Sequence, residues 1–137
     1  MNIYFACSIT GGREFESVYQ EIVSSLLSAG HEIPTSHLAQ AEAMQGERIL
    51  SPHDVYERDV NWIQKCDVLV AEVSIPSHGV GYEIAYALNI RKPVLCIYQQ
   101  GRSVSKMITG NPDPALRIKS YFTVEDAIKE IHIFLNA

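Results

Sequence analysis

Short apolar runs alternate with longer amphipathic stretches along this chain of 137 residues. The short runs predict buried strands, and apolar residues that recur at steps of three and four predict helices. Strands are predicted at 3–7, 32–33, 67–73, 94–98 and 120–122. Helices are predicted from Phe15 to a stop at Gly30, and at 51–65, 80–89, 105–108 and 123–135.

This alternation is typical of βαβ units and a parallel sheet. The predicted fold is α/β: a doubly wound, flavodoxin-like or Rossmann-like, five-stranded parallel sheet with helices on both faces. Residues 1–137 are expected to form a single domain, because domains cluster at roughly 100–150 residues. Ligands of such sheets bind beyond the carboxyl ends of the strands. We therefore expect the site in the loops after the first, third and fourth strands, with 34–50, including a turn of helix at 38–44, as a long active-site loop.

Composition narrows the class of protein. With 47% hydrophobic and 20% charged residues the chain is an ordinary globular one. Its 11 basic and 16 acidic residues give a net charge of −5, which argues against a nucleic-acid polymer as partner. No run of about 18 apolar residues and no basic leader is present, so a soluble, cytoplasmic protein is expected, or a nuclear one in a eukaryote. Three widely spaced cysteines are expected to be buried reduced thiols, not metal ligands: Cys7, Cys66 and Cys96.

Two of the loops carry unusual residues. The segment 8–13 holds Gly11 and Gly12, which let the backbone approach a ligand and expose N–H groups at a helix start; a plain tight turn is the alternative. The segment 77–83 places a serine, two glycines and Glu83 at a helix N-terminus, a position that favours anions. A carboxylate that merely complements the helix dipole is the alternative explanation for Glu83.

A second acid lies on the helix before the third predicted strand. Asp59 falls between Val55 and Ile63 at steps of four, which places it on the inward face. A buried carboxylate needs a partner, because an unpaired charge in the interior is very costly. The alternative to a functional role is an ion pair with one of three arginines, Arg13, Arg58 or Arg91. Two acids that face one crevice suit glycosidic bond cleavage, in which one attacks the anomeric carbon and the other manages protons.

Four segments carry a resemblance to a known family: 4–13, 57–62, 71–83 and 103–110. In order along nearly the whole chain, they resemble the Rcl-type 2′-deoxynucleoside 5′-phosphate N-hydrolase family, part of the nucleoside 2-deoxyribosyltransferase superfamily. The run Pro-Ser-x-Gly-Val-Gly-Tyr-Glu at 76–83 is the most specific match. The resemblance implies hydrolysis of the N-glycosidic bond of a 2′-deoxynucleoside 5′-monophosphate, a small-molecule substrate, to free base and 2-deoxyribose 5-phosphate. It implies no metal, no cofactor and no membrane partner.

The resemblance also implies roles for the matching residues. Glu83 matches the nucleophile that forms a covalent glycosyl-enzyme, and Asp59 matches the acid that positions the sugar and assists departure of the base. Tyr4 matches a tyrosine that orients the nucleophile, and Ser105 matches a serine that completes the site of the neighbouring subunit in a homodimer. The implied substrate-binding residues are Cys7, Ile9, Thr10, Gly11, His37, Ser77, Gly79, Ser105 and Met107.

The chain departs from the family pattern at Thr10, where relatives carry an arginine. One cationic contact to the nucleotide is lost, so phosphate binding depends more on N–H groups and hydroxyls. His37 matches a histidine in the loop over the base, with a merely solvated side chain as the alternative. Two other functions stay open at this point: a deoxyribosyltransferase that passes the sugar between bases, and a non-catalytic nucleotide-binding module.

Overall fold

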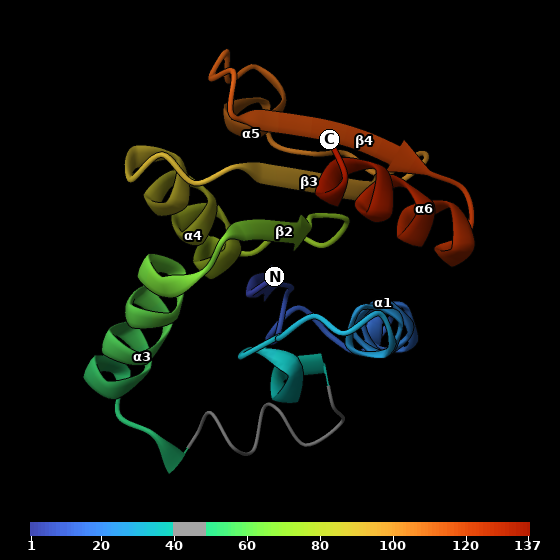
Figure 1. Ribbon diagram of the computed structural model, residues 1–137. Coiled ribbons are helices and arrows are strands. Elements are labelled where there is room, and N and C mark those ends of the chain that lie inside the picture. The colour runs from blue at the N-terminus through green and yellow to red at the C-terminus, as the bar shows by residue number, and fades with distance from the viewer. Residues whose placement is uncertain (40–48) are drawn as a thin grey trace.

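The computed structural model describes residues 1–39 and 49–137, and Figure 1 shows a twisted sheet between two layers of helices. The sheet has four strands, which are β1 (Ile3–Ala6), β2 (Val68–Glu72), β3 (Val94–Gln99) and β4 (Leu116–Tyr121). They lie in the order β1-β2-β3-β4, and every neighbouring pair is parallel. The predicted α/β fold with a parallel sheet is confirmed.

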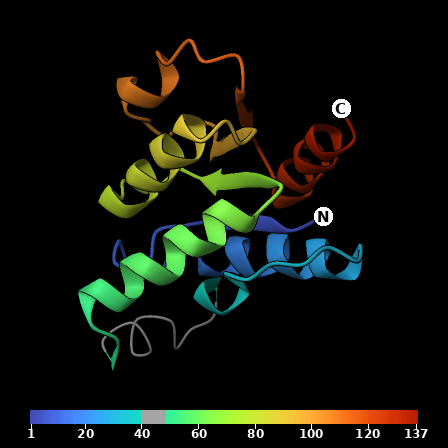
Figure 2. The same cartoon turned by 60° about the vertical axis from the view of Figure 1, so that its left-hand side comes forward.

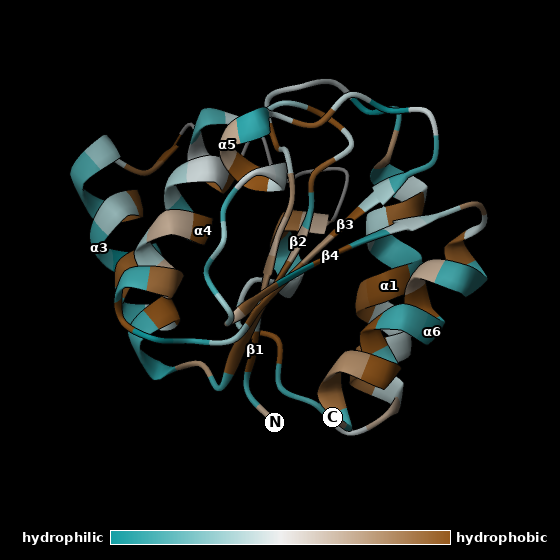
Figure 3. Ribbon diagram, turned by 90° about the horizontal axis from the view of Figure 1, so that it is seen from above, coloured by the Kyte–Doolittle hydropathy of each residue, from teal (hydrophilic) through white to brown (hydrophobic). Residues whose placement is uncertain are grey.

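Helices cover both faces of this sheet, as predicted. Seen from above in Figure 3, α1 (Glu16–Ser28) and α6 (Val124–Leu135) lie on one side. On the other side lie α3 (Pro52–Lys65), α4 (His78–Asn89) and the short α5 (Lys106–Thr109). Figure 2 shows α3 and α4 next to each other, and residues of the two helices are in contact. A 3₁₀ turn, η1 (Ser36–Ala39), follows α1 along the chain and contacts it.

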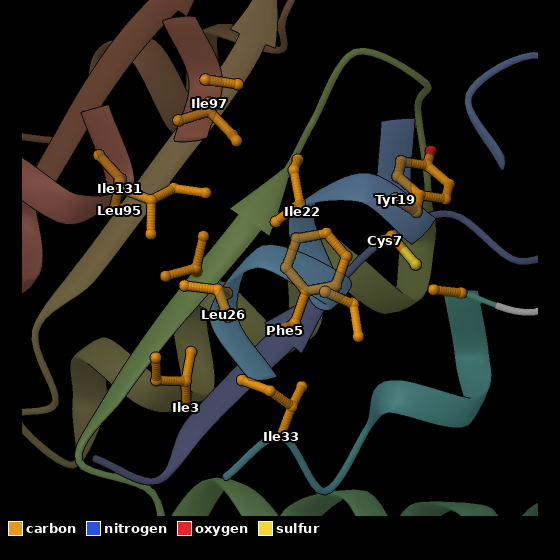
Figure 4. Packing of buried hydrophobic residues seen from close by; sticks show 14 of the residues in the cluster. Ile3, Phe5, Cys7, Tyr19, Ile22, Leu26, Ile33, Leu95, Ile97 and Ile131 are labelled. Carbon is orange, nitrogen blue, oxygen red and sulfur yellow. The ribbon is translucent and has the colours of Figure 1, made fainter. Parts of the chain in front are cut away.

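Alternating side chains of the strands build two separate cores. Ile3 and Phe5 belong to the core under α1 and α6, whereas Tyr4 and Ala6 belong to the core under α3 and α4. Figure 4 shows the first of these cores, in which the Phe5 ring meets the Tyr19 ring of α1 edge-on at 6.2 Å between centroids. All four residues of β1 are buried. The Tyr4 hydroxyl therefore lies in the second core, where a buried polar group needs a hydrogen-bond partner.

The prediction of five strands is wrong. In the described part of the chain, Glu32 forms an isolated parallel bridge to Asn2 and no strand. Pro34 has no N–H for a strand ladder. The Thr35 hydroxyl takes the place of further ladder bonds, because it accepts from the N–H of Phe5 at 3.1 Å and donates to the Phe5 carbonyl at 2.8 Å. Ile33 still packs into the first core. A single bridge therefore lies beside β1, where a short strand at 32–33 was expected.

The last strand is an edge strand, as predicted, but it begins earlier than the expected 120–122. Leu116 and Ile118 are half-buried and alternate with exposed Arg117 and Lys119. This period of two is the pattern of a strand with one solvated face. The alternation is present in the sequence, and it marks the strand better than the aromatic residues used to predict it.

The predicted helix boundaries have local physical causes. Ser51 accepts a hydrogen bond from the backbone N–H of Asp54 at 3.1 Å, with Pro52 at the first helical position. Thr123 and Asp126 form a reciprocal capping box at the start of α6. Gly30, just beyond α1, has a φ of 89°, which favours glycine. Of the predicted turn of helix at 38–44, residues 38–39 belong to η1, and 40–44 lie outside the described residues.

None of the helices in residues 1–39 and 49–137 combines the length and apolarity that crossing a membrane requires.

Candidate active site

The carboxyl ends of β1 and β2 meet at the point where the strand order reverses. From β1 the chain runs to the Glu32 bridge on one side of that strand, and it returns to β2 on the other side. The register pairs Ala6 with Ala71, so both strands end together. A cavity of about 290 Å³ opens there, at the place that sheets of this kind use for ligands. It is lined by residues of both loops and of α3 and α4: Cys7, Ile9, Thr10, Val55, Tyr56, Asp59, Val60, Ile63, Ser77, Gly79, Val80, Tyr82 and Glu83.

Glu83 lines this cavity from the second turn of α4, and its carboxylate is bound by Tyr4 of β1. The Tyr4 hydroxyl donates a hydrogen bond to Oε2 of Glu83. Tyr4 is fully buried. Burial, followed by the nearby Glu83 and Asp59 carboxylates, raises the pKa of Tyr4 well above its usual range, while Arg58 acts in the opposite direction. Tyr4 therefore stays protonated and remains a hydrogen-bond donor to Glu83.

Asp59 lines the same cavity from α3, which confirms the inward face predicted from its spacing. Its Oδ1 lies 2.9 Å from Nε of Arg58, and both side chains are about one-fifth exposed. The guanidinium carbon of Arg58 lies 4.9 Å from the centre of the Trp62 ring, within cation–π range. The ion pair weighed as an alternative is therefore present, and Asp59 faces the cavity as well.

The loop after β1 presses against the loop after β2 at Gly11. A side chain at Gly11 would overlap Cγ2 of Ile75 and would lie 2.5 Å from Oγ of Ser8. The backbone N–H of Gly11 donates to that same Ser8 Oγ at 3.1 Å. Gly12 follows with a φ of 100°. The glycine pair therefore serves close packing of the two loops as well as access of a ligand to the backbone.

The start of α4 forms the opposite wall. Ser77 is the N-cap, and its Oγ accepts a hydrogen bond from the N–H of Val80 at 3.3 Å. A Cβ placed on Gly79 would lie 3.9 Å from both Ser77 Oγ and Glu83 Oε1. Gly79 thus faces the space between a hydroxyl and a carboxylate. The N-terminus of a helix suits a negatively charged group, because its N–H groups and the helix dipole point positive charge toward it.

Cys7 is part of the cavity wall. It is buried, and burial followed by the charges of Glu83 and Glu72 raises the pKa of Cys7 to about 12. The thiol therefore stays protonated at neutral pH. Among the described residues, no group of three His, Cys, Asp or Glu side chains is placed to hold a metal ion.

Four of the residues predicted for substrate binding do not line this cavity, namely Gly11, His37, Ser105 and Met107. Gly11 lies at the contact between the two loops. The His37 ring is next to Trp62, with 5.7 Å between ring centroids. Ser105 and Met107 line a second hollow of about 760 Å³ between α4 and α5, and Met107 is 84% exposed. Ser77 and Val80 line both hollows, which are therefore neighbours.

Sequence reasoning missed Tyr56 and Tyr82, which stand at the rim of the cavity. Each is about half exposed, and their rings meet edge-on at 6.3 Å between centroids. Tyr56 lies three residues before Asp59 and therefore shares its helix face. Tyr82 is the neighbour of Glu83. The signal in the sequence that could have predicted both tyrosines is their position relative to Asp59 and Glu83.

The fold and the acid pair define a class of protein. A family model described as nucleoside 2-deoxyribosyltransferase matches residues 3–130. The chain therefore belongs to the nucleoside 2-deoxyribosyltransferase family. A solved structure titled CMP N-glycosidase BcmB, from Clostridium botulinum, shares the fold at a TM-score of 0.70 and 17% identity, covering 95% of this chain and 97% of that one.

Relatives place the chain more narrowly. A protein of Methanosarcina mazei named "Putative 2′-deoxynucleoside 5′-phosphate N-hydrolase 1" is 40% identical over 137 residues, which is 99% of this chain and 84% of that protein. The rat protein named 5-hydroxymethyl-dUMP N-hydrolase is 44% identical over 116 residues, 82% of this chain and 71% of its own length. The predicted membership of the 2′-deoxynucleoside 5′-phosphate N-hydrolase group is thus confirmed.

Proposed function

We propose that this chain hydrolyses the N-glycosidic bond of 2′-deoxynucleoside 5′-monophosphates, giving free base and 2-deoxyribose 5-phosphate. One observation carries the proposal: Glu83 and Asp59, from two different helices, line one cavity at the carboxyl edge of the sheet. Relatives named as N-hydrolases of 2′-deoxynucleoside 5′-phosphates and of 5-hydroxymethyl-dUMP support the substrate class.

Glu83 is the nucleophile in this proposal. Because Tyr4 holds Oε2, the carboxylate presents Oε1 toward Gly79 and the cavity. Oε1 attacks C1′ as the bond to the base breaks, and the bonding electron pair leaves with the base nitrogen. A glycosyl ester on Glu83 results, as in retaining glycosidases. A 2-deoxy sugar favours this route, because it lacks the electron-withdrawing hydroxyl that destabilises an oxocarbenium-like transition state.

Asp59 manages the protons. Asp59 donates a proton to the base nitrogen as the bond to the base breaks, and the resulting carboxylate then accepts a proton from the water that attacks C1′. The C1′–Oε1 bond breaks in this second step, which restores the Glu83 carboxylate and completes 2-deoxyribose 5-phosphate. Arg58 holds Asp59 at 2.9 Å and fixes the orientation of its carboxylate.

The 5′-phosphate is expected at the N-terminus of α4, close to Ser77 and Gly79 and to the backbone of residues 9–11. These groups supply hydroxyl and N–H donors, and the helix dipole favours a negative charge there. Ser105 completes the phosphate site of a neighbouring subunit in the proposed homodimer. Its exposure and its place in the hollow beside Ser77 are compatible with that contact.

A substrate panel tests this proposal. Purified protein is incubated with dGMP, dAMP, dCMP and dUMP, with GMP as the matched ribonucleotide and deoxyguanosine as the matched unphosphorylated nucleoside. Release of free base is followed by liquid chromatography, with and without an added acceptor base. We expect base release from at least one deoxynucleotide without an acceptor, and slower release from GMP and deoxyguanosine. Base exchange that requires an acceptor would instead show a transferase, and no release from any deoxynucleotide would refute the proposal.

A further inference from the structure

A buried carboxylate lies behind the active-site cavity, and the proposed chemistry does not use it. Glu72 is the last residue of β2 and is fully buried. In Figure 1 the arrowhead of β2 marks the end of the strand at which it lies, where the chain turns toward α4. Burying a carboxylate costs free energy unless hydrogen bonds compensate for the lost water. The position therefore calls for an explanation beyond filling the core.

Three donors converge on this carboxylate. The N–H of Ser74 donates to Oε1 at 2.6 Å, and the Ser74 hydroxyl donates to Oε2 at 2.9 Å. The hydroxyl of Tyr121, at the end of β4, also donates to Oε2. Ser74 Oγ in turn accepts from the backbone N–H of Gln99, at the end of β3, at 2.8 Å. Glu72 thus ties the carboxyl ends of β2, β3 and β4 to one residue of the following loop.

The loop tied in this way is the one that carries the predicted phosphate donors. Ile75, next to Ser74, packs so tightly on Gly11 that no side chain fits there. Ser77, two residues further on, caps α4 and lines the cavity. The position of Ser74 therefore sets both the N-terminus of α4 and the gap between the two loops.

The hydrogen bonds oppose the effect of burial on Glu72. Burial raises the pKa of Glu72, whereas the Tyr121 hydroxyl, the N–H and hydroxyl of Ser74, and the charge of Arg102 lower it. The charge of Glu72 also contributes to the raised pKa of Cys7, which lies in the cavity wall. The charge of Glu72 therefore acts on a residue of the cavity wall, although Glu72 itself does not line the cavity.

We infer that Glu72 is a positioning residue, which holds the Ser74–Ser77 loop so that its donors and those of the Gly11 loop face one phosphate group. The inference rests on the proposed function. Glu72 acts through Ser74 and does not touch substrate. Its loss is expected to weaken binding of the phosphorylated substrate more than it slows the chemical steps at Glu83.

Kinetics of two variants separate this role from a general structural one. Glu72→Ala removes all three acceptor contacts, and Glu72→Gln keeps one carbonyl oxygen for the Ser74 N–H. For a deoxynucleotide that the wild type hydrolyses, we expect Glu72→Ala to raise KM at least about tenfold, the size of one hydrogen bond to a charged group. We expect kcat to stay within about threefold, and Glu72→Gln to recover part of the loss. An unchanged KM, or a fall in kcat alone, would overturn the inference.

Milder variants keep the test decisive if Glu72→Ala does not fold. Ser74→Ala removes the hydroxyl that links Glu72 to Gln99, and Tyr121→Phe removes one donor while keeping the ring. Both are expected to raise KM, with Ser74→Ala the larger effect. Ile131→Val, a buried change in α6 within the same core as Tyr121, is the control for lowered stability. An equal rise of KM in Ile131→Val would overturn the inference.

Amide hydrogen exchange tests the same role without relying on turnover. In Glu72→Gln we expect faster exchange at residues 74–80, with α1 and α6 unchanged. Exchange equal to wild type throughout, or faster exchange spread over the whole protein, would overturn the positioning role. If the wild type released no base at all, the proposed function would fail, whereas this measurement would still decide whether Glu72 holds the loop.

Discussion

Removing the Tyr4 hydroxyl is a sharp perturbation of the proposed mechanism. Tyr4 is fully buried, its hydroxyl donates to Oε2 of Glu83, and its side chain does not line the cavity. Tyr4→Phe therefore leaves the substrate-binding surface intact and removes one hydrogen bond that orients the Glu83 carboxylate. A hydrogen bond to a charged group contributes about 1.5–3 kcal/mol. At 1.36 kcal/mol per factor of ten, kcat should fall about 10- to 150-fold with little change in KM.

The assay is steady-state base release from a deoxynucleotide between pH 5 and 10. Because burial and two neighbouring carboxylates raise the pKa of Tyr4 far above its usual range, wild-type activity should show no alkaline loss from ionisation of this residue. Tyr86→Phe is the matched control, since it removes a tyrosine hydroxyl that accepts from Gln64 on the outer side of the same two helices. A kcat within twofold of wild type in Tyr4→Phe would refute the orienting role, as would an equal loss in Tyr86→Phe.

Three further predictions follow from the cavity and its walls. Gly79→Ala places a methyl group at van der Waals distance from Ser77 Oγ and Glu83 Oε1, so we expect a raised KM with little change in melting temperature; an unchanged KM would contradict the proposed place of the substrate. Gly11→Ala forces the two loops apart and should cost about 1–3 kcal/mol, lowering the melting temperature in calorimetry by roughly 4–12 °C; unchanged stability would show that the loops do not press on each other. Cys7, Cys66 and Cys96 are all buried, and burial raises the pKa of Cys7 and of Cys96 to about 12. A thiol reagent at pH 8 should therefore modify none of the three rapidly in the native protein and all three after unfolding; fast labelling of the native protein would contradict their burial.

Much of the fold and of the acid pair could be predicted because the signals are local. The spacing of Val55, Asp59 and Ile63 placed the acid on the inner face of α3, and the structure confirms that face. The alternation of predicted strands and helices along the chain indicated a parallel sheet with helices on both faces. The strand predicted near Glu32 is only a bridge, because Pro34 has no N–H with which to extend the pairing.

Features that depend on distant residues could not be predicted. The contact of Tyr121 with Glu72 joins residues 49 positions apart, and nothing in the local pattern of either marks it. The resemblance predicts His37 over the base, and this stays a prediction; the structure sets the His37 ring against the Trp62 ring. Ser105 and Met107 lie in the neighbouring hollow, so their predicted part in the site stays a prediction that depends on a second subunit.

Glu83→Gln tests the central proposal most directly. The amide has nearly the same size as the carboxylate but cannot form the glycosyl ester, while Glu21→Gln, at an exposed position on α1, is the matched control. Base release from a deoxynucleoside 5′-monophosphate is measured for both variants, after calorimetry has shown that each still binds 2-deoxyribose 5-phosphate. We predict that Glu83→Gln loses turnover and keeps binding, with Glu21→Gln equal to wild type. Near-normal turnover by Glu83→Gln would contradict the assignment of Glu83 as the nucleophile.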